Sequence, residues 1–165
     1  MFGGNLMKIA IVPGSFDPMT LGHLDIVKRA TALFDKVIVA VMVNESKKYM
    51  FSMEERLEIA KLTCEGIENV SVIADDGLLV SLAEREGACA IVKGARNAQD
   101  YVYEEKMARY NALKNPNVQT VLLVCDSTLS NISSTEVRER LEKNRDISDI
   151  VSQNAIKCIL KNAGK

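Results

Sequence analysis

The sequence has no tryptophan, a single histidine and only three prolines, and its four cysteines are widely separated. A zinc site needs several histidine or cysteine ligands at short spacing. The thiols stand instead at Cys64, Cys89, Cys125 and Cys158. We therefore expect no metal held by protein ligands, and reduced thiols in a cytoplasmic protein.

Long apolar runs and an excess of one charge are also missing. A membrane-spanning helix needs about 20 consecutive apolar residues, and the chain contains no such run, so we expect no membrane association. The 21 basic and 22 acidic residues give a net charge of −1. That balance provides no global positive field for a nucleic acid. Local clusters of cations must therefore hold any anionic ligand.

The composition is that of one aliphatic globular domain. The chain has 165 residues, of which 47% are hydrophobic and 5% aromatic, and this length is sufficient for a substantial core. Residues 1–6, MFGGNL, precede a second methionine and have no features of a secretory signal. We interpret them as an N-terminal extension or a remnant of expression, and expect a single domain over residues 7–165.

Short apolar runs alternate with helical patterns along the chain. The runs at residues 8–12, 36–43, 70–74, 89–93 and 118–125 are mostly continuous, which is typical of strands buried in a parallel sheet. Helical stripes occupy residues 24–34, 53–64, 78–86 and 99–114, and two late helices are expected at 134–143 and 148–162. The pattern predicts a doubly wound, Rossmann-like α/β fold with a five-stranded parallel sheet, helices on both faces and C-terminal helices.

In such folds ligands bind at the carboxyl ends of the strands, which selects the loops at residues 13–22, 44–52, 93–98 and 126–134. The first loop has neither the GxGxxG spacing of dinucleotide-binding proteins nor a GK[ST] sequence. It does place His23 at the start of a helix, where the helix dipole favours an anion and a neutral imidazole. The alternative is that His23 merely forms a hydrogen bond to the loop at the helix start.

Two segments resemble a known superfamily. GSFDPMTLGH, at residues 14–23, is similar to the signature of nucleotidyltransferases with a (T/H)xGH motif, and NISSTEVRERL, at residues 131–141, is similar to their ISSS or ISST segment. From Met7 onward the chain most resembles the bacterial phosphopantetheine adenylyltransferase family. The similarity is concentrated in PGSFDPMTLGHLDIVKRA, NESKKYMFSMEERLEIA, IVKGARNAQDYVYEEKMARYN and SNISSTEVRERL.

The resemblance implies an enzyme of coenzyme A biosynthesis that joins ATP and 4′-phosphopantetheine into dephospho-coenzyme A and pyrophosphate. It further implies Mg²⁺ accompanying ATP without an assigned protein ligand, a homohexamer, and coenzyme A as a candidate feedback inhibitor. Nicotinate-mononucleotide adenylyltransferases and cytidylyltransferases share the histidine motif and are alternatives, as is a non-catalytic nucleotide-binding regulator. The SKK and KGARN segments favour phosphopantetheine as the acceptor.

The resemblance also assigns roles to residues. An attacking phosphate is already an anion, so the reaction needs positioning and charge relief more than a strong base. His23 is then the catalytic residue that stabilises the transition state. The expected ATP-binding residues are Ser15, Phe16, His23, Gly94, Ala95, Arg96, Glu104, Leu129, Ser130, Asn131, Ile132, Ser133, Ser134 and Thr135. The expected acceptor-binding residues are Ser15, Lys47, Leu79 and Lys93.

Ordinary structural roles compete with these assignments. Lys47 and Lys48 could belong to a solvated loop, Leu79 could pack in the core, KGARN could be a surface turn, and Ser133 or Ser134 could cap a helix. Tyr103, Met107 and Tyr110 have helical spacing and are expected in the core or an interface. Three positions depart from the common family pattern: Lys93 replaces arginine, Thr135 replaces serine, and Leu129 stands where an aromatic residue is frequent.

Overall fold

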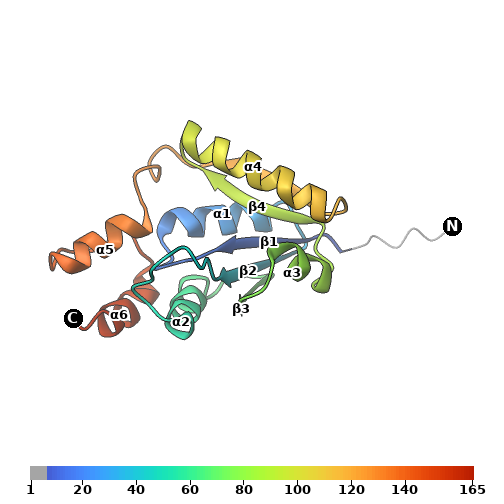
Figure 1. Ribbon diagram of the computed structural model, residues 1–165. Helices are drawn as coiled ribbons and strands as arrows, with labels where there is room; N and C mark the ends of the chain where they lie inside the picture. The colour runs from blue at the N-terminus through green and yellow to red at the C-terminus, as the bar shows by residue number, and fades with distance from the viewer. Residues whose placement is uncertain (1–6) are drawn as a thin grey trace.

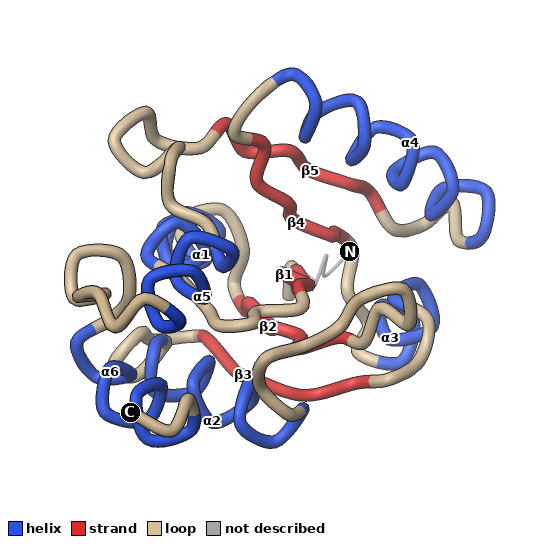
Figure 2. Tube along the Cα trace, turned by 60° about the vertical axis from the view of Figure 1, so that its left-hand side comes forward, coloured by secondary structure: helices blue, strands red, loops and turns tan. Residues whose placement is uncertain are grey.

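The computed structural model describes residues 7–165, so the expected N-terminal extension lies outside the described residues. Its five strands form one parallel sheet in the order β3-β2-β1-β4-β5; Figure 1 labels the first four, and β5 is labelled in Figure 2. The strands are β1 (Ile9–Gly14), β2 (Lys36–Met42), β3 (Val70–Asp75), β4 (Ala90–Ala95) and β5 (Gln119–Val124). The predicted Rossmann-like α/β fold is confirmed.

Helices cover both faces of the sheet. They are α1 (Leu21–Thr31), α2 (Met53–Thr63), α3 (Leu79–Arg85), α4 (Ala98–Lys114), α5 (Ser134–Glu142) and α6 (Gln153–Asn162). Figure 2 shows α1, α2, α5 and α6 on one side of the sheet and α3 and α4 on the other. Within β1, Ala10 and Val12 belong to the core on the α1 side, whereas Ile11 faces the α3 side. Among the described residues, no helix combines the length and the apolar character needed to cross a membrane.

The strand order places a switch point next to β1. From β1 the chain proceeds outward through β2 and β3, then returns to β4 on the other side of β1. The connections that leave the carboxyl ends of β1 and β4 therefore run in opposite directions and leave a crevice between them. The loop with the histidine motif leaves one side of this crevice, and the KGARN segment leaves the other.

Local sequence signals explain where several helices begin. Ser52 caps α2, because its hydroxyl accepts a hydrogen bond from the Glu55 amide at 3.2 Å and the Glu55 carboxylate accepts one from the Ser52 amide at 2.7 Å. Helix α1 begins at Leu21, because Thr20 is its N-cap. The late helix α6 begins at Gln153, which is later than predicted. The preceding turn buries Ile150 and Val151, and these apolar residues extend the helical pattern toward the N-terminus in the sequence.

The KGARN segment is also less loop-like than expected. Lys93, Gly94 and Ala95 belong to β4, and they continue its pairing with Leu122, Leu123 and Val124 of β5. The connection to α4 consists only of Arg96 and Asn97. The interpretation of this segment as a surface turn is therefore wrong for its first three residues.

The packing of α2 on the sheet provides a test of the core. Ile59 is fully buried, whereas Leu33, just after α1, is 55% exposed. Ile59→Ala should lower the free energy of unfolding by about 2–5 kcal/mol, because it removes buried methyl groups and leaves a cavity. Leu33→Ala should cost less than about 1 kcal/mol. Urea denaturation monitored by circular dichroism measures both changes, and equal losses would contradict this placement of α2.

Candidate active site

A cavity of about 540 Å³ opens at the carboxyl ends of β1 and β4. This volume is typical of small-molecule sites, which occupy roughly 300–1,000 Å³. Its walls include most of the residues predicted from sequence: Ser15, Phe16, His23, Lys47, Lys93, Gly94, Arg96, Glu104, Leu129, Ile132, Ser133, Ser134 and Thr135. Four predicted residues are not part of the walls of this cavity in the described structure: Leu79, Ala95, Ser130 and Asn131.

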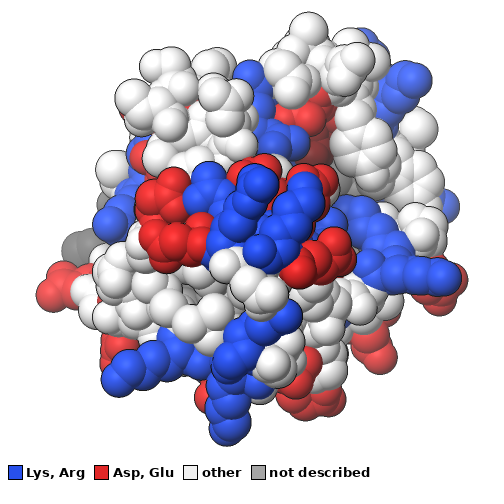
Figure 3. Space-filling model, turned by 90° about the vertical axis from the view of Figure 1, so that its left-hand side faces the viewer, with Lys and Arg blue, Asp and Glu red and all other residues white. Residues whose placement is uncertain are grey.

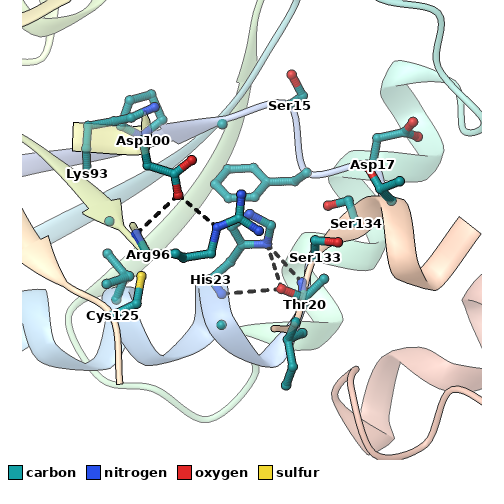
Figure 4. Close-up of a pocket in the computed structure, with 18 of the residues that line it drawn as sticks. Ser15, Asp17, Thr20, His23, Lys93, Arg96, Asp100, Cys125, Ser133 and Ser134 are labelled. Carbon is teal, nitrogen blue, oxygen red and sulfur yellow. Dashed lines mark hydrogen bonds and ion pairs between the residues drawn. The ribbon is translucent and has the colours of Figure 1, made fainter. Parts of the chain in front are cut away.

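The imidazole of His23 is oriented by Thr20, the N-cap of α1. The Thr20 amide N–H donates to Nδ1 of His23 at 3.1 Å, and the Thr20 hydroxyl lies 3.0 Å from the same nitrogen (Figure 4). In return, the His23 amide donates to the Thr20 hydroxyl at 3.5 Å. Because an amide can only donate, Nδ1 must accept, and the proton of the neutral ring is on Nε2. His23 thus presents a hydrogen-bond donor while also forming part of the helix cap.

The surroundings keep this ring neutral. Burial, together with the nearby positive charges of Lys93, Arg96 and Lys47, lowers the pKa of His23 from 6.5 to about 4. The geometry acts in the same direction, since a proton on Nδ1 would face the Thr20 amide donor. At neutral pH His23 is therefore a neutral donor, as expected from its place at a helix start.

The ring of Phe16 packs against the imidazole of His23. Phe16 is only 3% exposed, and its ring meets His23 edge to face, with the ring centroids 5.1 Å apart. The backbone of Phe16 has a φ of 48°, which is a strained conformation for a residue with a side chain. Gly14 makes this arrangement possible, because a Cβ there would lie 2.8 Å from atoms of the Phe16 ring. The glycine and phenylalanine of the motif thus hold the histidine in place.

Two cations on the β4 side are each held by a carboxylate of α4. The Nζ of Lys93 lies 3.1 Å from the Glu104 carboxylate. Arg96 donates to Asp100 through its amide at 3.1 Å and through Nε at 2.9 Å (Figure 4). Each pair fixes a flexible cation at the cavity wall, so the ligand-binding geometry is partly pre-organised.

Gly94 has a packing role that the sequence did not indicate. A Cβ at this position would lie 3.0 Å from Cγ1 of Ile26 and 3.1 Å from Sγ of Cys125. Because Gly94 is inside β4, its small size lets α1 approach the sheet closely. Its position between two cations is therefore explained by packing as well as by access to a ligand.

Helix α5 forms the opposite wall and is fastened to the loop after β1. Ser133 caps α5 by accepting from the Glu136 amide at 3.1 Å, and the Ser134 hydroxyl donates to the Pro18 carbonyl at 2.8 Å. The predicted capping role is confirmed for Ser133. Ser134 instead joins α5 to the histidine-motif loop, and the amides of Ser134 and Thr135 at the start of α5 remain available for an anion.

Arg138 and Asp17 were not assigned from sequence, although both stand in the quoted motifs. Arg138 donates to the Asp17 carbonyl at 2.6 Å and to the Thr135 hydroxyl at 3.2 Å, and its Nη1 lies 3.6 Å from the Asp17 carboxylate. The same carboxylate accepts from the amides of Met50 and Phe51 at 3.0 and 2.9 Å. Charged residues in a loop and a helix give no sequence signal that they will meet at one cavity.

Some predicted contacts lie elsewhere. Leu79 is the first residue of α3 and packs against the core on the α3 side of the sheet, which agrees with the ordinary packing alternative. The Ser130 hydroxyl donates to the Ser127 carbonyl at 2.9 Å within its own turn. Whether these residues contact a ligand stays a prediction, and so do the ligand contacts of the residues in the cavity walls.

The cavity mouth is rich in cations. Figure 3 shows the side of the molecule at which the strands end, which is the left-hand side of Figure 1. Lys and Arg side chains gather on this side, with Asp and Glu directly beside them. The basic residues of the cavity walls are Lys47, Lys48, Lys93, Arg96 and Arg138, and the acidic ones are Asp17, Asp100 and Glu104. Within residues 7–165, no group of three or more His, Cys, Asp or Glu side chains is placed to hold a metal ion. The arrangement suits a ligand that carries several phosphates.

A neutral histidine and several cations at the switch point of a Rossmann-like sheet form a site suited to phosphate compounds in an α/β protein. The profile of the cytidylyltransferase-like family matches residues 11–140. A phosphopantetheine adenylyltransferase of Caldanaerobacter subterraneus subsp. tengcongensis is 45% identical over 88% of this chain and 91% of its own. Those of Limosilactobacillus reuteri and Clostridium novyi are 42% and 40% identical, over 94% and 96% of this chain and 90% and 99% of theirs.

The chain belongs to the cytidylyltransferase-like family and, within it, to the phosphopantetheine adenylyltransferases. The resemblance that the sequence motifs indicated is confirmed at this level. The similarity extends along nearly the whole chain, so it includes all four loops at the carboxyl edge of the sheet as well as the histidine motif.

The protonation state of His23 can be measured directly, because the chain has one histidine. In ¹H NMR its imidazole C–H signals should titrate well below pH 6.5, with a midpoint near 4. Since the unfolded chain takes up the proton first, the contribution of His23 to folding stability should be complete above pH 6.5 and decline as the pH falls toward 4. Arg96→Gln should raise the midpoint. A midpoint near 6.5 would contradict the burial and charge effects described here.

Proposed function

We propose that this protein transfers the adenylyl group of ATP to 4′-phosphopantetheine and releases dephospho-coenzyme A and pyrophosphate. The proposal is supported by the names of relatives that match nearly the whole chain. The observation that carries it is the environment of His23, whose Nδ1 is engaged by Thr20 so that Nε2–H remains as a donor on the cavity wall. The cations around this donor suit a reaction between two phosphates.

The proposed reaction is a direct in-line displacement. An oxygen of the acceptor's 4′-phosphate attacks the α-phosphorus of ATP, the bond from that phosphorus to the bridging oxygen breaks, and pyrophosphate leaves with the bonding electrons. The attacking oxygen is already an anion, so no proton must be removed first. His23 Nε2–H donates to an oxygen of the α-phosphate, where negative charge increases in the transition state. No covalent enzyme intermediate is needed.

The remaining residues bind and orient the two substrates. We assign Lys47 and Ser15 to the acceptor phosphate, with Lys93 and Leu79 toward the pantetheine chain. Arg96, Arg138 and the free amides at the start of α5 bind the ATP phosphates. The other nucleotide contacts are assigned to Ser15, which then contacts both substrates, and to Phe16, Gly94, Ala95, Glu104 and residues 129–135. These assignments rest on the family resemblance, and four of the assigned residues lie outside the walls of the described cavity: Leu79, Ala95, Ser130 and Asn131.

Mg²⁺ is proposed as the ion that accompanies ATP, with phosphate and water oxygens as its ligands. It would neutralise part of the phosphate charge, and we assign it no protein ligand. Coenzyme A is proposed as a feedback inhibitor because it contains the acceptor portion of the product. A cytoplasmic location is also proposed, and it is compatible with the four free cysteines at Cys64, Cys89, Cys125 and Cys158.

A homohexamer is proposed from the family resemblance, and the surface of α4 supports self-association. Six of the eleven large hydrophobic residues exposed among residues 7–165 lie on this helix: Tyr101, Val102, Tyr103, Met107, Tyr110 and Leu113. The core alternative for Tyr103, Met107 and Tyr110 is therefore wrong for the single chain. An apolar helix surface of this kind is typical of an interface, while the number of six subunits rests on the resemblance alone.

A pyrophosphate-release assay tests the function. The protein is mixed with ATP and Mg²⁺ and with 4′-phosphopantetheine or nicotinate mononucleotide in turn, and CTP replaces ATP in a parallel series. Pyrophosphate should appear only with ATP and 4′-phosphopantetheine, together with dephospho-coenzyme A. Release with another pair would identify a different nucleotidyltransferase, and nucleotide binding without release would indicate a regulator.

Replacing His23 should affect turnover more than binding. His23→Ala should lower kcat by about 10²-fold or more while the KM for ATP changes only several-fold, because the lost donor acts mainly on transition-state charge. His23→Gln can place an amide donor near the Nε2 position and should lose less. Steady-state kinetics with each substrate varied in turn measures both effects. Unchanged turnover in His23→Ala would leave this residue with its capping role alone.

Lys93 provides a test of the acceptor side. Lys93→Arg should retain activity, whereas Lys93→Ala should raise the KM for 4′-phosphopantetheine by roughly ten- to a hundredfold and affect ATP much less. Because Lys93 pairs with Glu104 at 3.1 Å, Lys93→Ala also leaves a carboxylate without its partner. The double variant Lys93→Ala, Glu104→Gln removes that charge, and Glu104→Gln alone gives the effect of changing Glu104, which is itself an assigned ATP contact. Equal effects on both substrates would show that Lys93 has a different role.

A further inference from the structure

Arg56 of α2 is a buried cation outside the walls of the cavity. Its side chain is 2% exposed, and it forms no ion pair with a carboxylate among residues 7–165. Nη1 donates to the backbone carbonyls of Ser15 at 2.6 Å and Met42 at 3.0 Å. The guanidinium carbon lies 4.0 Å from the centroid of the Tyr49 ring, and Nε has no hydrogen-bond partner in the described structure.

This arrangement is costly for a purely structural side chain. Burying a charge without a counter-charge is unfavourable, and an apolar side chain of similar volume often fills such a site at a lower cost in stability. Two carbonyl dipoles and an aromatic face offset only part of the cost. A buried arginine of this kind therefore requires another explanation than packing.

The partners of Arg56 belong to the segments that carry the acceptor-phosphate residues. Ser15 stands in the loop after β1, and Met42 is the last residue of β2. Tyr49 lies two residues beyond Lys47 and closes their shared loop, because its hydroxyl accepts from the Asn44 amide at 2.5 Å and donates to the Asn44 carbonyl at 3.1 Å. One guanidinium thus contacts the Ser15 loop and both ends of the segment with Lys47.

We propose that Arg56 is a positioning residue for the acceptor phosphate: it fixes the Ser15 loop against the Lys47 loop and places a positive charge behind them. Arg56 itself does not touch the substrate. The inference rests on the proposed function, since it assigns Ser15 and Lys47 to that phosphate. Its consequence is specific, because the groups assigned to the ATP phosphates are His23, Arg96, Arg138 and the start of α5, and none of them contributes a hydrogen-bond partner to Arg56.

The test compares Arg56→Met and Arg56→Lys with Arg145→Met, which removes one exposed arginine between α5 and α6. Arg56→Met should raise the KM for 4′-phosphopantetheine by about ten- to a hundredfold, as for loss of a charge-assisted contact, with the KM for ATP within several-fold. Arg56→Lys keeps the charge but is shorter and loses the planar group that lies over Tyr49, so its KM should lie between the wild-type and Met values. Arg145→Met should behave as wild type. Circular dichroism and thermal unfolding establish that each variant is folded.

Pantetheine, which lacks the phosphate, distinguishes a loss of acceptor-phosphate binding from a general disruption of the site. As a competitive inhibitor it should have the same inhibition constant with wild type and Arg56→Lys, while the KM for 4′-phosphopantetheine rises. A parallel loss for pantetheine and ATP, or no change in the KM for 4′-phosphopantetheine, would overturn the role of Arg56. If Arg56→Met does not fold, Arg56→Lys alone decides between these results. A wild-type protein that releases no pyrophosphate would instead refute the proposed function, and this inference with it.

Discussion

The hydrogen bond between the Thr20 amide and Nδ1 of His23 is the constraint on which the site depends. It completes the cap of α1 and at the same time fixes the ring so that Nε2 carries the proton. The start of the helix and the chemical state of the histidine are therefore one feature. Burial and the charges of Lys93, Arg96 and Lys47 act on the same ring and keep it neutral. A charged imidazole would lose this geometry, because Nδ1 would have to donate.

The loop before this helix is held by three other elements. Asp17 accepts from two amides in the segment before α2, Arg138 of α5 donates to the carbonyl of the same aspartate, and Arg56 of α2 holds Ser15. These contacts leave few degrees of freedom at the place where two phosphates must meet. Positioning is the main contribution that a protein can make to phosphoryl chemistry of this kind. The rigidity of the loop is thus part of the proposed mechanism.

The cations around the cavity differ in how they are held. Lys93 and Arg96 are paired with Glu104 and Asp100, whereas Lys47 forms no ion pair within the described part of the chain. Paired cations are pre-oriented but partly neutralised, and an exposed lysine keeps its full charge and mobility. A ligand with several phosphates can use both kinds. The combination explains how a chain with a net charge of −1 can bind polyanions.

The sequence by itself determined the order of strands and helices, because apolar periodicity and caps such as Ser52 are local patterns. It also placed His23 at a helix start and identified the segments that meet at the carboxyl edge. Only the tertiary structure decided that β4 continues beyond Lys93 through Gly94 and Ala95, since their pairing partners in β5 are distant in sequence. The tertiary structure alone also showed that Arg56 is buried and donates to the Ser15 carbonyl. A charged residue in a helix is ordinarily exposed, and its burial depends on how separate segments pack in three dimensions.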